Sequence, residues 1–430
     1  MTTGGHIPLA SFHLLQRTGP SLAKLADLSG STLESLNGLG IAAKKLLGKR
    51  VAVAVGSRGI ASLKEIVQAV CGWLKTQGAQ PFIFPAMGSH GGGTAEGQRK
   101  ILEDYGVTEA AMGVEIRSSM ETVLLGTTPE GFRVFVDRNA WESDGVLAIN
   151  RVKPHTDFSG KIESGLLKMI AIGMGKLEGA AEGHRQSWQY GFETAIRAVS
   201  AKVLASGRIL CGVALVENEL HEIAVLRAAL PEGIVAQEES TLQLARTLVP
   251  RIPFPAFHLL MVDEIGKNIS GTGMDTKVIG RVVELPPGEA PMISMIYVRD
   301  LTRQSDGNAV GVGFADVIHE RLFRKIDFDK MYLNTRTSLN PAAGRLPIHL
   351  PSDREALDLA LGHLGSPQPA EQRIVWIRNT LSLDRMAISA PLAGEATALK
   401  HWRLSEGTHA AGFDPAGNLN SLLGAADLRF

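Results

Sequence analysis

Two hydrophobic patterns alternate along the first part of the chain. The run Val51–Val55 is apolar at every position, which is typical of a parallel strand buried on both faces. The longer stretch Ile60–Leu74 has apolar residues at helical spacing. A second apolar run follows at Pro81–Phe84. The order strand, helix, strand predicts a βαβ unit.

Further elements are indicated before residue 150. Apolar groups at helical spacing predict a helix over 20–48. Thr94 is suited to cap a helix over 95–105. Two apolar runs separated by a turn predict a hairpin at 123–136. The apolar run 145–150 predicts a third buried strand.

The same patterns continue to the end of the chain. Helices are predicted near 192–205, 236–249, 308–325 and 352–364, and strands near 208–217, 221–230, 258–263, 292–299 and 373–378. Proline density at Pro250-Arg-Ile-Pro-Phe-Pro suggests a domain boundary. We therefore predict an α/β fold with two domains, 1–250 and 251–430, each a mainly parallel sheet flanked by helices.

Amino-acid composition indicates which kinds of binding partner to expect. Hydrophobic residues make up 44% of the 430 residues and charged residues 20%, which is typical of globular proteins. The 44 basic residues balance 44 acidic ones, so there is no electrostatic signature for a nucleic acid or an anionic membrane. We expect a small-molecule partner.

Cysteine usage and the N-terminus suggest the compartment. Cys71 and Cys211 are the two cysteines, which excludes a disulfide framework, a CxxC zinc site and a cysteine-ligated iron–sulfur cluster within one chain. The sequence shows no signal-peptide pattern and no apolar run long enough for a membrane helix. We expect a cytoplasmic protein that binds no membrane.

Three predicted strands end in polar loops. These are Ser57-Arg58, Ser89-His90 and Lys153–His155. Ligands of open α/β sheets bind outside the carboxyl ends of the strands. The sequence therefore predicts one site built from three loops, and we expect it in the cleft between the domains.

His90 lies among glycines that include Gly91 and Gly92. Such glycines let backbone N–H groups approach a phosphate, and the start of the following helix favours an anion. A tight turn with a solvent-facing histidine is the alternative. The motif His-Gly-Gly-Gly also occurs in hydrolases, but no Gly-x-Ser-x-Gly elbow accompanies it, so we discount that class.

His155 and Lys168 are the next candidates. His155 follows Pro154 and could exchange a proton near neutral pH, or simply bond a carbonyl. Lys168 stands in an apolar segment, where it either extends to the surface or offers an amine for a covalent link to a cofactor. Lys161 would lie on nearly the same face of a continuous helix and is its rival.

His184 follows Lys168 by sixteen residues. In a continuous helix the two would lie on opposite sides, so joint action requires a break between them. Glycines that could provide it are Gly173, Gly175, Gly179 and Gly183. One histidine is a poor metal site by itself, so a metal at His184 would need other ligands.

In order and spacing, these residues resemble the nickel-dependent lactate racemase family. The resemblance implies that His90 and His155 form an acid/base pair and that Lys168 carries a pyridinium-derived nucleotide through a thioamide. It implies that this nickel-pincer nucleotide holds the metal through sulfur and carbon, with His184 as the protein ligand. Hydride would move from the α-carbon of a 2-hydroxy acid to the cofactor and back. Enzymes of cofactor synthesis would be partners.

The resemblance also has departures. Arg58 matches a family arginine, and Ser57 and Arg58 together with Gly91 and Gly92 would contact the nucleotide. Val55 stands where the family carries an acidic residue. The family carries a Gln and Lys pair in its second domain, and by location Lys267 and Lys277 are the substitutes here. These departures favour a racemase or epimerase of a hydroxy acid other than lactate.

Two other function classes are compatible with the same residues. One is a different metal- or nucleotide-dependent enzyme that uses the same loops, with zinc or iron at His90, His155 and His184. The other is a non-catalytic protein that binds the ligand without turnover, because a fold by itself does not determine a function.

Overall fold

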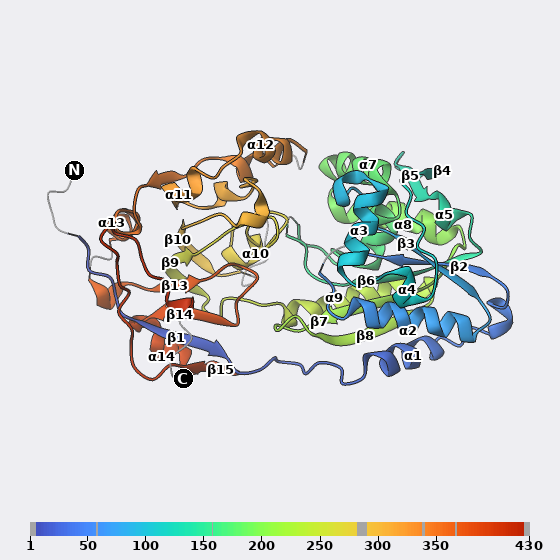
Figure 1. Ribbon diagram of the computed structural model, residues 1–430, viewed down its shortest axis with the longest axis horizontal. Coiled ribbons are helices and arrows are strands. Elements are labelled where there is room, and N and C mark those ends of the chain that lie inside the picture. Colours follow the sequence, from blue (N-terminus) through green and yellow to red (C-terminus); the bar gives the residue numbers. More distant parts are fainter. Residues whose placement is uncertain are drawn as a thin grey trace. The chain divides into compact units, whose positions relative to one another are not determined.

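The computed structural model divides the chain into two compact units (Figure 1). It describes residues 6–56, 59–156, 158–281, 290–337, 340–365 and 368–424. One unit comprises residues 21–249, and the other comprises residues 1–20 and 250–430. We call them the 21–249 unit and the 250–430 unit. The longer segment of the 250–430 unit begins at Pro250, within the proline-rich segment.

The first twenty residues lie in the 250–430 unit and not with the domain 1–250 that we expected. Strand β1 (Phe12–Arg17) pairs antiparallel with β14 (Arg385–Ser389) and with β15 (Trp402–Leu404). Phe12 and Leu14 are fully buried in this sheet. The N-terminal strand is therefore fixed by burial against residues far away in the sequence.

The 21–249 unit is built on a five-stranded sheet in the order β3-β2-β6-β7-β8. Its strands are β2 (Arg50–Val55), β3 (Gln80–Pro85), β6 (Gly145–Arg151), β7 (Ile209–Glu217) and β8 (Ile223–Ala229). All neighbours are parallel except β7 and β8. The predicted hairpin is confirmed as β4 (Thr122–Thr127) and β5 (Arg133–Asp137).

Helices cover both faces of this sheet. They are α1 (Leu28–Asn37), α2 (Leu63–Thr76), α3 (Ala95–Asp104), α4 (Glu109–Met112), α5 (Arg138–Trp141), α6 (Leu166–Lys168), α7 (Lys176–Tyr190), α8 (Phe192–Ala205) and α9 (Ile234–Leu248). Side chains that alternate along β2 pack with α1 and α2 on one side and with α6, α8 and α9 on the other. The prediction of one helix over 20–48 is wrong: α1 ends before Gly38, and Gly40 has φ 63°.

The 250–430 unit is built on an eight-stranded sheet in the order β12-β11-β10-β9-β13-β14-β1-β15. Its remaining strands are β9 (Ala256–Val262), β10 (Met292–Val298), β11 (Val317–His319), β12 (Ile348–Leu350) and β13 (Ile374–Ile377). The strands from β12 to β13 are parallel, and the last three are antiparallel. Both units thus have the predicted α/β architecture.

The helices of this unit lie on both faces of the parallel strands. They are α10 (Thr276–Ile279), α11 (Glu320–Phe323), α12 (Phe328–Thr337), α13 (Asp353–His363) and α14 (Ala393–Ala396). The helix predicted over 308–325 is wrong, because β11 occupies its centre and buries Val317 and Ile318 between β10 and β12. Among the described residues, no helix has the length and apolarity needed to cross a membrane.

Candidate functional site

The predicted site residues of the 21–249 unit follow neighbouring strands at a topological switch point. The chain passes from β2 to β3 on one side and later to β6 on the other. Val55 pairs with Pro85 and with Ile149, so the carboxyl ends of the three strands meet at one edge. Ligands of open α/β sheets bind at such an edge. Ser57 and Arg58, which follow β2, lie outside the described residues.

The loop after β3 holds His90 half-buried, directly before a 3₁₀ turn at Gly91–Gly93. Gly91 has φ 65°, and a Cβ there would lie 2.5 Å from the carbonyl carbon of Gly97 in α3. Gly92 has φ 66° and open space around its missing Cβ. Gly91 is therefore required for packing against α3, whereas Gly92 leaves room for a ligand.

A buried lysine that the sequence analysis did not single out supports this loop. Lys176 is fully buried in the left-handed conformation, with φ 53°. Its Nζ lies 3.1 Å from Oδ2 of Asp137, which is also fully buried. The same Nζ donates to the carbonyl oxygen of Pro85, at the end of β3, and lies 3.1 Å from Oε1 of Gln98. Burial lowers the pKa of Lys176 and raises the pKa of Asp137, against their mutual attraction.

Gln98 connects this lysine to the His90 loop. Its Nε2 donates to the carbonyl oxygens of Gly88, at 2.8 Å, and His90, at 3.3 Å. Gln98 itself is fully buried in α3. The loop is thus held from inside the unit by a continuous set of buried polar contacts. A lysine after Met174-Gly175, within an apolar and glycine-rich stretch, was the one signal in the sequence.

Lys168 ends the short helix α6 and is half-buried. The buried carboxylate of Glu238 caps this helix, because its Oε2 accepts a hydrogen bond of 2.9 Å from the backbone N–H of Leu167. Burial raises the pKa of Glu238 to about 7. Lys161 is exposed in the loop before α6, so the expectation that it shares a helical face with Lys168 is wrong.

The predicted break between Lys168 and His184 is present. Residues Met169–Gly173 form a π-helical segment, and α7 begins anew after Gly175. π-Helical turns are rare and often occur at functional sites. The backbone N–H of Gly88 donates to the carbonyl oxygen of Gly173 at 3.0 Å, which joins the π-helical segment to the His90 loop.

His155 and His184 approach a common aromatic ring. The ring centroid of Phe192, the first residue of α8, lies 5.9 Å from that of His155 and 6.2 Å from that of His184. Phe158 stacks on Phe192 at 4.9 Å and contacts His155 at 4.6 Å. The sequence analysis missed both phenylalanines, whose contacts depend on the folded loop.

Glu163 fixes the loop that carries His155. It is fully buried, and it accepts a hydrogen bond of 2.5 Å from the backbone N–H of His155 and one of 2.6 Å from Nη2 of Arg246 in α9. Charge-assisted hydrogen bonds of this kind hold a loop in one conformation. The position of the His155 backbone is therefore set by a buried carboxylate.

Protein ligands for a complete metal site are not gathered in the described part of the chain. No group of three or more His, Cys, Asp or Glu side chains there is arranged to hold a metal ion. His90, His155 and His184 thus do not form a three-histidine cluster. In the 250–430 unit, Lys267 donates from Nζ to the carbonyl oxygen of Gly271, and Lys277 lies in α10.

The chain shares its fold with a solved structure. The lactate racemase apoprotein from Thermoanaerobacterium thermosaccharolyticum has a TM-score of 0.51 at 12% identity, over 87% of this chain and 99% of that one. A protein from Thermotoga maritima has a TM-score of 0.49 at 16% identity, over 74% and 81%. No curated protein matches the chain.

The family comparison concerns the part that contains the candidate residues. Residues 43–191 match the family model described as the lactate racemase N-terminal domain. This range runs from before β2 to the end of α7. Residues 43–191 are thus similar to a lactate racemase N-terminal domain, and the chain shares its fold with a lactate racemase apoprotein.

Proposed function

We propose that the protein is a racemase or epimerase of a 2-hydroxy acid, acting by reversible hydride transfer with a nickel-pincer nucleotide. The family supports the racemase or epimerase class, and hence an isomerase, in general. The observation that carries the finer proposal is that the matched range 43–191 contains His90, His155, Lys168 and His184. Departures from the family pattern favour a substrate other than lactate.

The residues present fit the proposed cofactor. A single histidine, His184, suits a metal whose other donors come from the cofactor, and imidazole is a good ligand for nickel. The amine of Lys168 is half-buried at the start of the π-helical segment, where it can serve as the attachment point. The open space at Gly92, together with Ser57 and Arg58, would hold the phosphate. When bound, the group would supply the acceptor for the hydride of the substrate α-carbon.

His90 and His155 are proposed as the acid/base pair. Racemisation by hydride transfer requires a base to take the proton of the substrate hydroxyl. Each enantiomer of the substrate presents this proton to a different side. Two histidines on separate loops can serve one hand each. The Lys176 contacts would hold the His90 loop, and Glu163 would hold the His155 backbone, so that neither has to reorder during a turnover.

Attachment of the cofactor is tested by intact-mass spectrometry and nickel analysis of protein produced together with cofactor-synthesis enzymes. The wild type and Lys161→Arg should gain the mass of the nucleotide and retain nickel. Lys168→Arg should stay unmodified, and His184→Ala should keep the mass but lose nickel. An unmodified wild type without nickel would refute the cofactor assignment, and modification of Lys168→Arg but not Lys161→Arg would move the tether to Lys161.

The reaction is tested with a panel of chiral 2-hydroxy acids deuterated at the α-carbon. Hydride transfer predicts that the product of the loaded protein retains the deuterium. His90→Gln and His155→Gln should each lower the rate by about a hundredfold or more, since positioned acid/base groups contribute about that much. His363→Gln, at an exposed position of α13, is the matched control. Ligand binding without turnover, unchanged in both variants, would favour a non-catalytic protein.

A further inference from the structure

The 250–430 unit contains a polar cavity of about 350 Å³ at the carboxyl ends of its parallel strands. Its lining includes Asp263 and Glu264 after β9, Arg299 and Asp300 after β10, and Arg378 after β13. The volume lies in the range of pockets that bind small molecules, about 300–1,000 Å³. The function proposed above uses none of the lining residues of this cavity.

The cavity lies at a topological switch point. The chain passes from β9 to β10, β11 and β12 on one side, and returns to place β13 on the other side of β9. Val262, the last residue of β9, pairs with Val298 and with Ile377. Residues that follow these three positions therefore meet outside the same edge of the sheet. That is where ligands bind in open α/β sheets.

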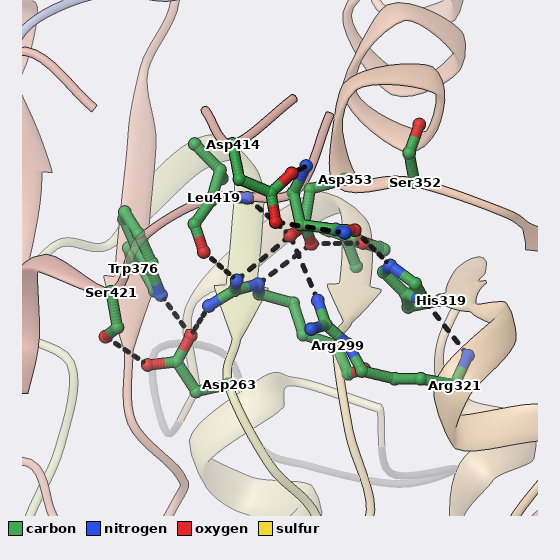
Figure 2. A network of polar contacts seen from close by, with 12 residues as sticks. Asp263, Arg299, His319, Arg321, Ser352, Asp353, Trp376, Asp414, Leu419 and Ser421 are labelled. Carbon is green, nitrogen blue, oxygen red and sulfur yellow. Dashed lines mark hydrogen bonds and ion pairs between the residues drawn. The ribbon is translucent and has the colours of Figure 1, made fainter. Parts of the chain in front are cut away.

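A buried charge network forms the inner wall of the cavity (Figure 2). Arg299 donates from Nε and Nη2 to the two carboxylate oxygens of Asp353, both at 2.9 Å, and from Nη1 to Asp263. Oδ1 of Asp263 also accepts from Nε1 of Trp376 at 2.7 Å, and its Oδ2 accepts from Oγ of Ser421 at 2.8 Å. This wall is fully hydrogen-bonded and rigid, so it offers a preorganised surface and little free hydrogen-bonding capacity.

The remaining carboxylates of the lining also have cationic partners. Asp300 accepts a hydrogen bond of 2.6 Å from Nζ of Lys325. Glu264 accepts from Nε of Arg378 at 3.2 Å and from Nδ2 of Asn379 at 3.1 Å. Because each acid of the lining is paired, the acids together do not create an unbalanced negative site.

Two guanidinium groups of the cavity lining retain unused donors. Arg321, 34% exposed, donates from Nη2 to Asp353 and from Nε to the carbonyl oxygen of Arg299. Its Nη1, and both Nη atoms of Arg378, have no hydrogen-bond partner among the residues that the structure describes. The Arg378 side chain is 66% exposed. A ligand that accepts hydrogen bonds from these N–H groups must supply acceptor oxygens. The planar guanidinium of arginine matches the geometry of carboxylate and phosphate groups.

We propose that this cavity is a binding site for a small anion that carries a carboxylate or phosphate group, held by Arg321 and Arg378 over the Arg299 wall. None of these residues is used in the hydroxy-acid chemistry proposed above. Arg378 donates to Glu264, and Arg299 makes its bonds to Asp353 and Asp263 without it, whereas Arg321 also donates to Asp353. Replacement of Arg378 therefore tests binding with the wall in place, and the Arg321 variant is compared with it once its folding has been verified.

The test is isothermal titration calorimetry of the full chain with inorganic phosphate and with succinate, at constant ionic strength set with sodium chloride. At least one of the two probes should bind with one-to-one stoichiometry. Arg378→Gln and Arg321→Gln should each weaken binding about tenfold, the typical effect of one charge-assisted hydrogen bond. Arg324→Gln is the matched control, since Arg324 is 75% exposed, pairs with Glu320 and is not part of the lining.

The two probes also distinguish the ligand classes. Binding of phosphate alone assigns the site to phosphate esters, and binding of succinate alone assigns it to carboxylates. If the folded wild type bound neither probe, the proposal would be overturned. So would affinity that is unchanged in the Arg321→Gln, Arg378→Gln double variant, with folding of each variant verified by its thermal transition.

Discussion

The two sheets share a switch-point layout, but the buried charges beside it are built differently. In the 21–249 unit, Lys176 and Asp137 form one fully buried ion pair. In the 250–430 unit, the two oxygens of Asp353 accept hydrogen bonds from Tyr297, Arg299, Arg321 and the backbone N–H of Leu419. We call the pair of Lys176 and Asp137 the sparse network, and the groups around Asp353 the saturated network.

The difference appears in the directions of the pKa shifts. Burial dominates in the sparse pair, so the pKa of Lys176 is lowered and that of Asp137 is raised toward the neutral forms. Burial acts the same way on Asp353, but the hydrogen bonds and charge of Arg299 outweigh it and lower the pKa of Asp353 to about 2. Whether burial or pairing prevails thus depends on how many donors reach the carboxylate.

The largest effect is expected at the saturated network. Asp353→Asn removes the charge that balances Arg299, which is 7% exposed and has little access to water. Removal of one partner of a buried ion pair costs about 3–5 kcal/mol, so we expect the free energy of unfolding to fall by about that amount. Chemical denaturation measures it, with the exposed Asp329→Asn as control. A loss below about 1 kcal/mol would show that Arg299 does not depend on the charge of Asp353.

Glu238 is a third buried carboxylate that can be compared with Asp137 and Asp353. Its hydrogen bond comes from the backbone N–H of Leu167 and not from a cationic side chain. Its Oε1 is buried without a hydrogen-bond partner in the described part of the chain. Because burial raises its pKa from 4.5 to about 7, the folded protein keeps a proton that the unfolded chain releases. Stability should therefore fall as the pH rises from about 4.5 to 7, by about 3 kcal/mol.

Glu238→Gln should remove this dependence, since glutamine keeps an acceptor for the N–H of Leu167 and does not ionise. Denaturation curves of the wild type, Glu238→Gln and the exposed control Glu232→Gln between pH 4 and 8 measure it. Parallel pH profiles for the wild type and Glu238→Gln would show that the carboxylate is already ionised in the folded protein.

The sparse pair should tolerate the loss of its cation better than the saturated network tolerates the loss of Asp353. Lys176→Met keeps the apolar stem, and Asp137, whose pKa is already raised, can take up a proton. We expect a loss of about 2 kcal/mol in the free energy of unfolding, most of it recovered in the Lys176→Met, Asp137→Asn double variant. Amide hydrogen exchange at Gly88–Gly93 should accelerate in the single variant. A loss equal to that of Asp353→Asn would remove the distinction between the networks.

The sequence predicted the elements whose signals are local. The apolar runs of β2 and β6 and the Thr94 cap of α3 depend on neighbouring residues, and each is present. The pairing of β1 with β14 was missed, because the two strands are separated by most of the chain and their contact leaves no local pattern. The error at 308–325 has the same origin, since β11 is a strand of three residues fixed by its neighbours.

The sequence was sufficient to name the candidate site residues, but not the buried contacts that hold them. His90, His155, Lys168 and His184 could be named from residue type and spacing, and the break after Lys168 followed from helical geometry. Lys176 was missed because its partners come from three other segments, and only the fold brings Asp137, Gln98 and Pro85 to one lysine. Spacing alone also placed Lys161 on the wrong element.

The smallest expected effects are at two helix caps, one beside each network. Thr94 Oγ1 accepts a hydrogen bond of 3.0 Å from the N–H of Gly97, at the start of α3. Ser352 Oγ accepts one of 3.2 Å from the N–H of Glu355, at the start of α13, directly before Asp353. Loss of such a cap costs about 1 kcal/mol.

Thr94→Ala and Ser352→Ala should therefore lower the free energy of unfolding by similar amounts, in contrast to the unequal effects of Lys176→Met and Asp353→Asn. Denaturant unfolding of both variants, with Thr94→Ser as the conservative control, measures this. If Ser352→Ala costs several times more than Thr94→Ala, the cap is coupled to Asp353, and the saturated network extends into the first turn of α13. Equal costs would confine the difference between the two units to the buried charges themselves, because the caps satisfy the same N–H groups in both.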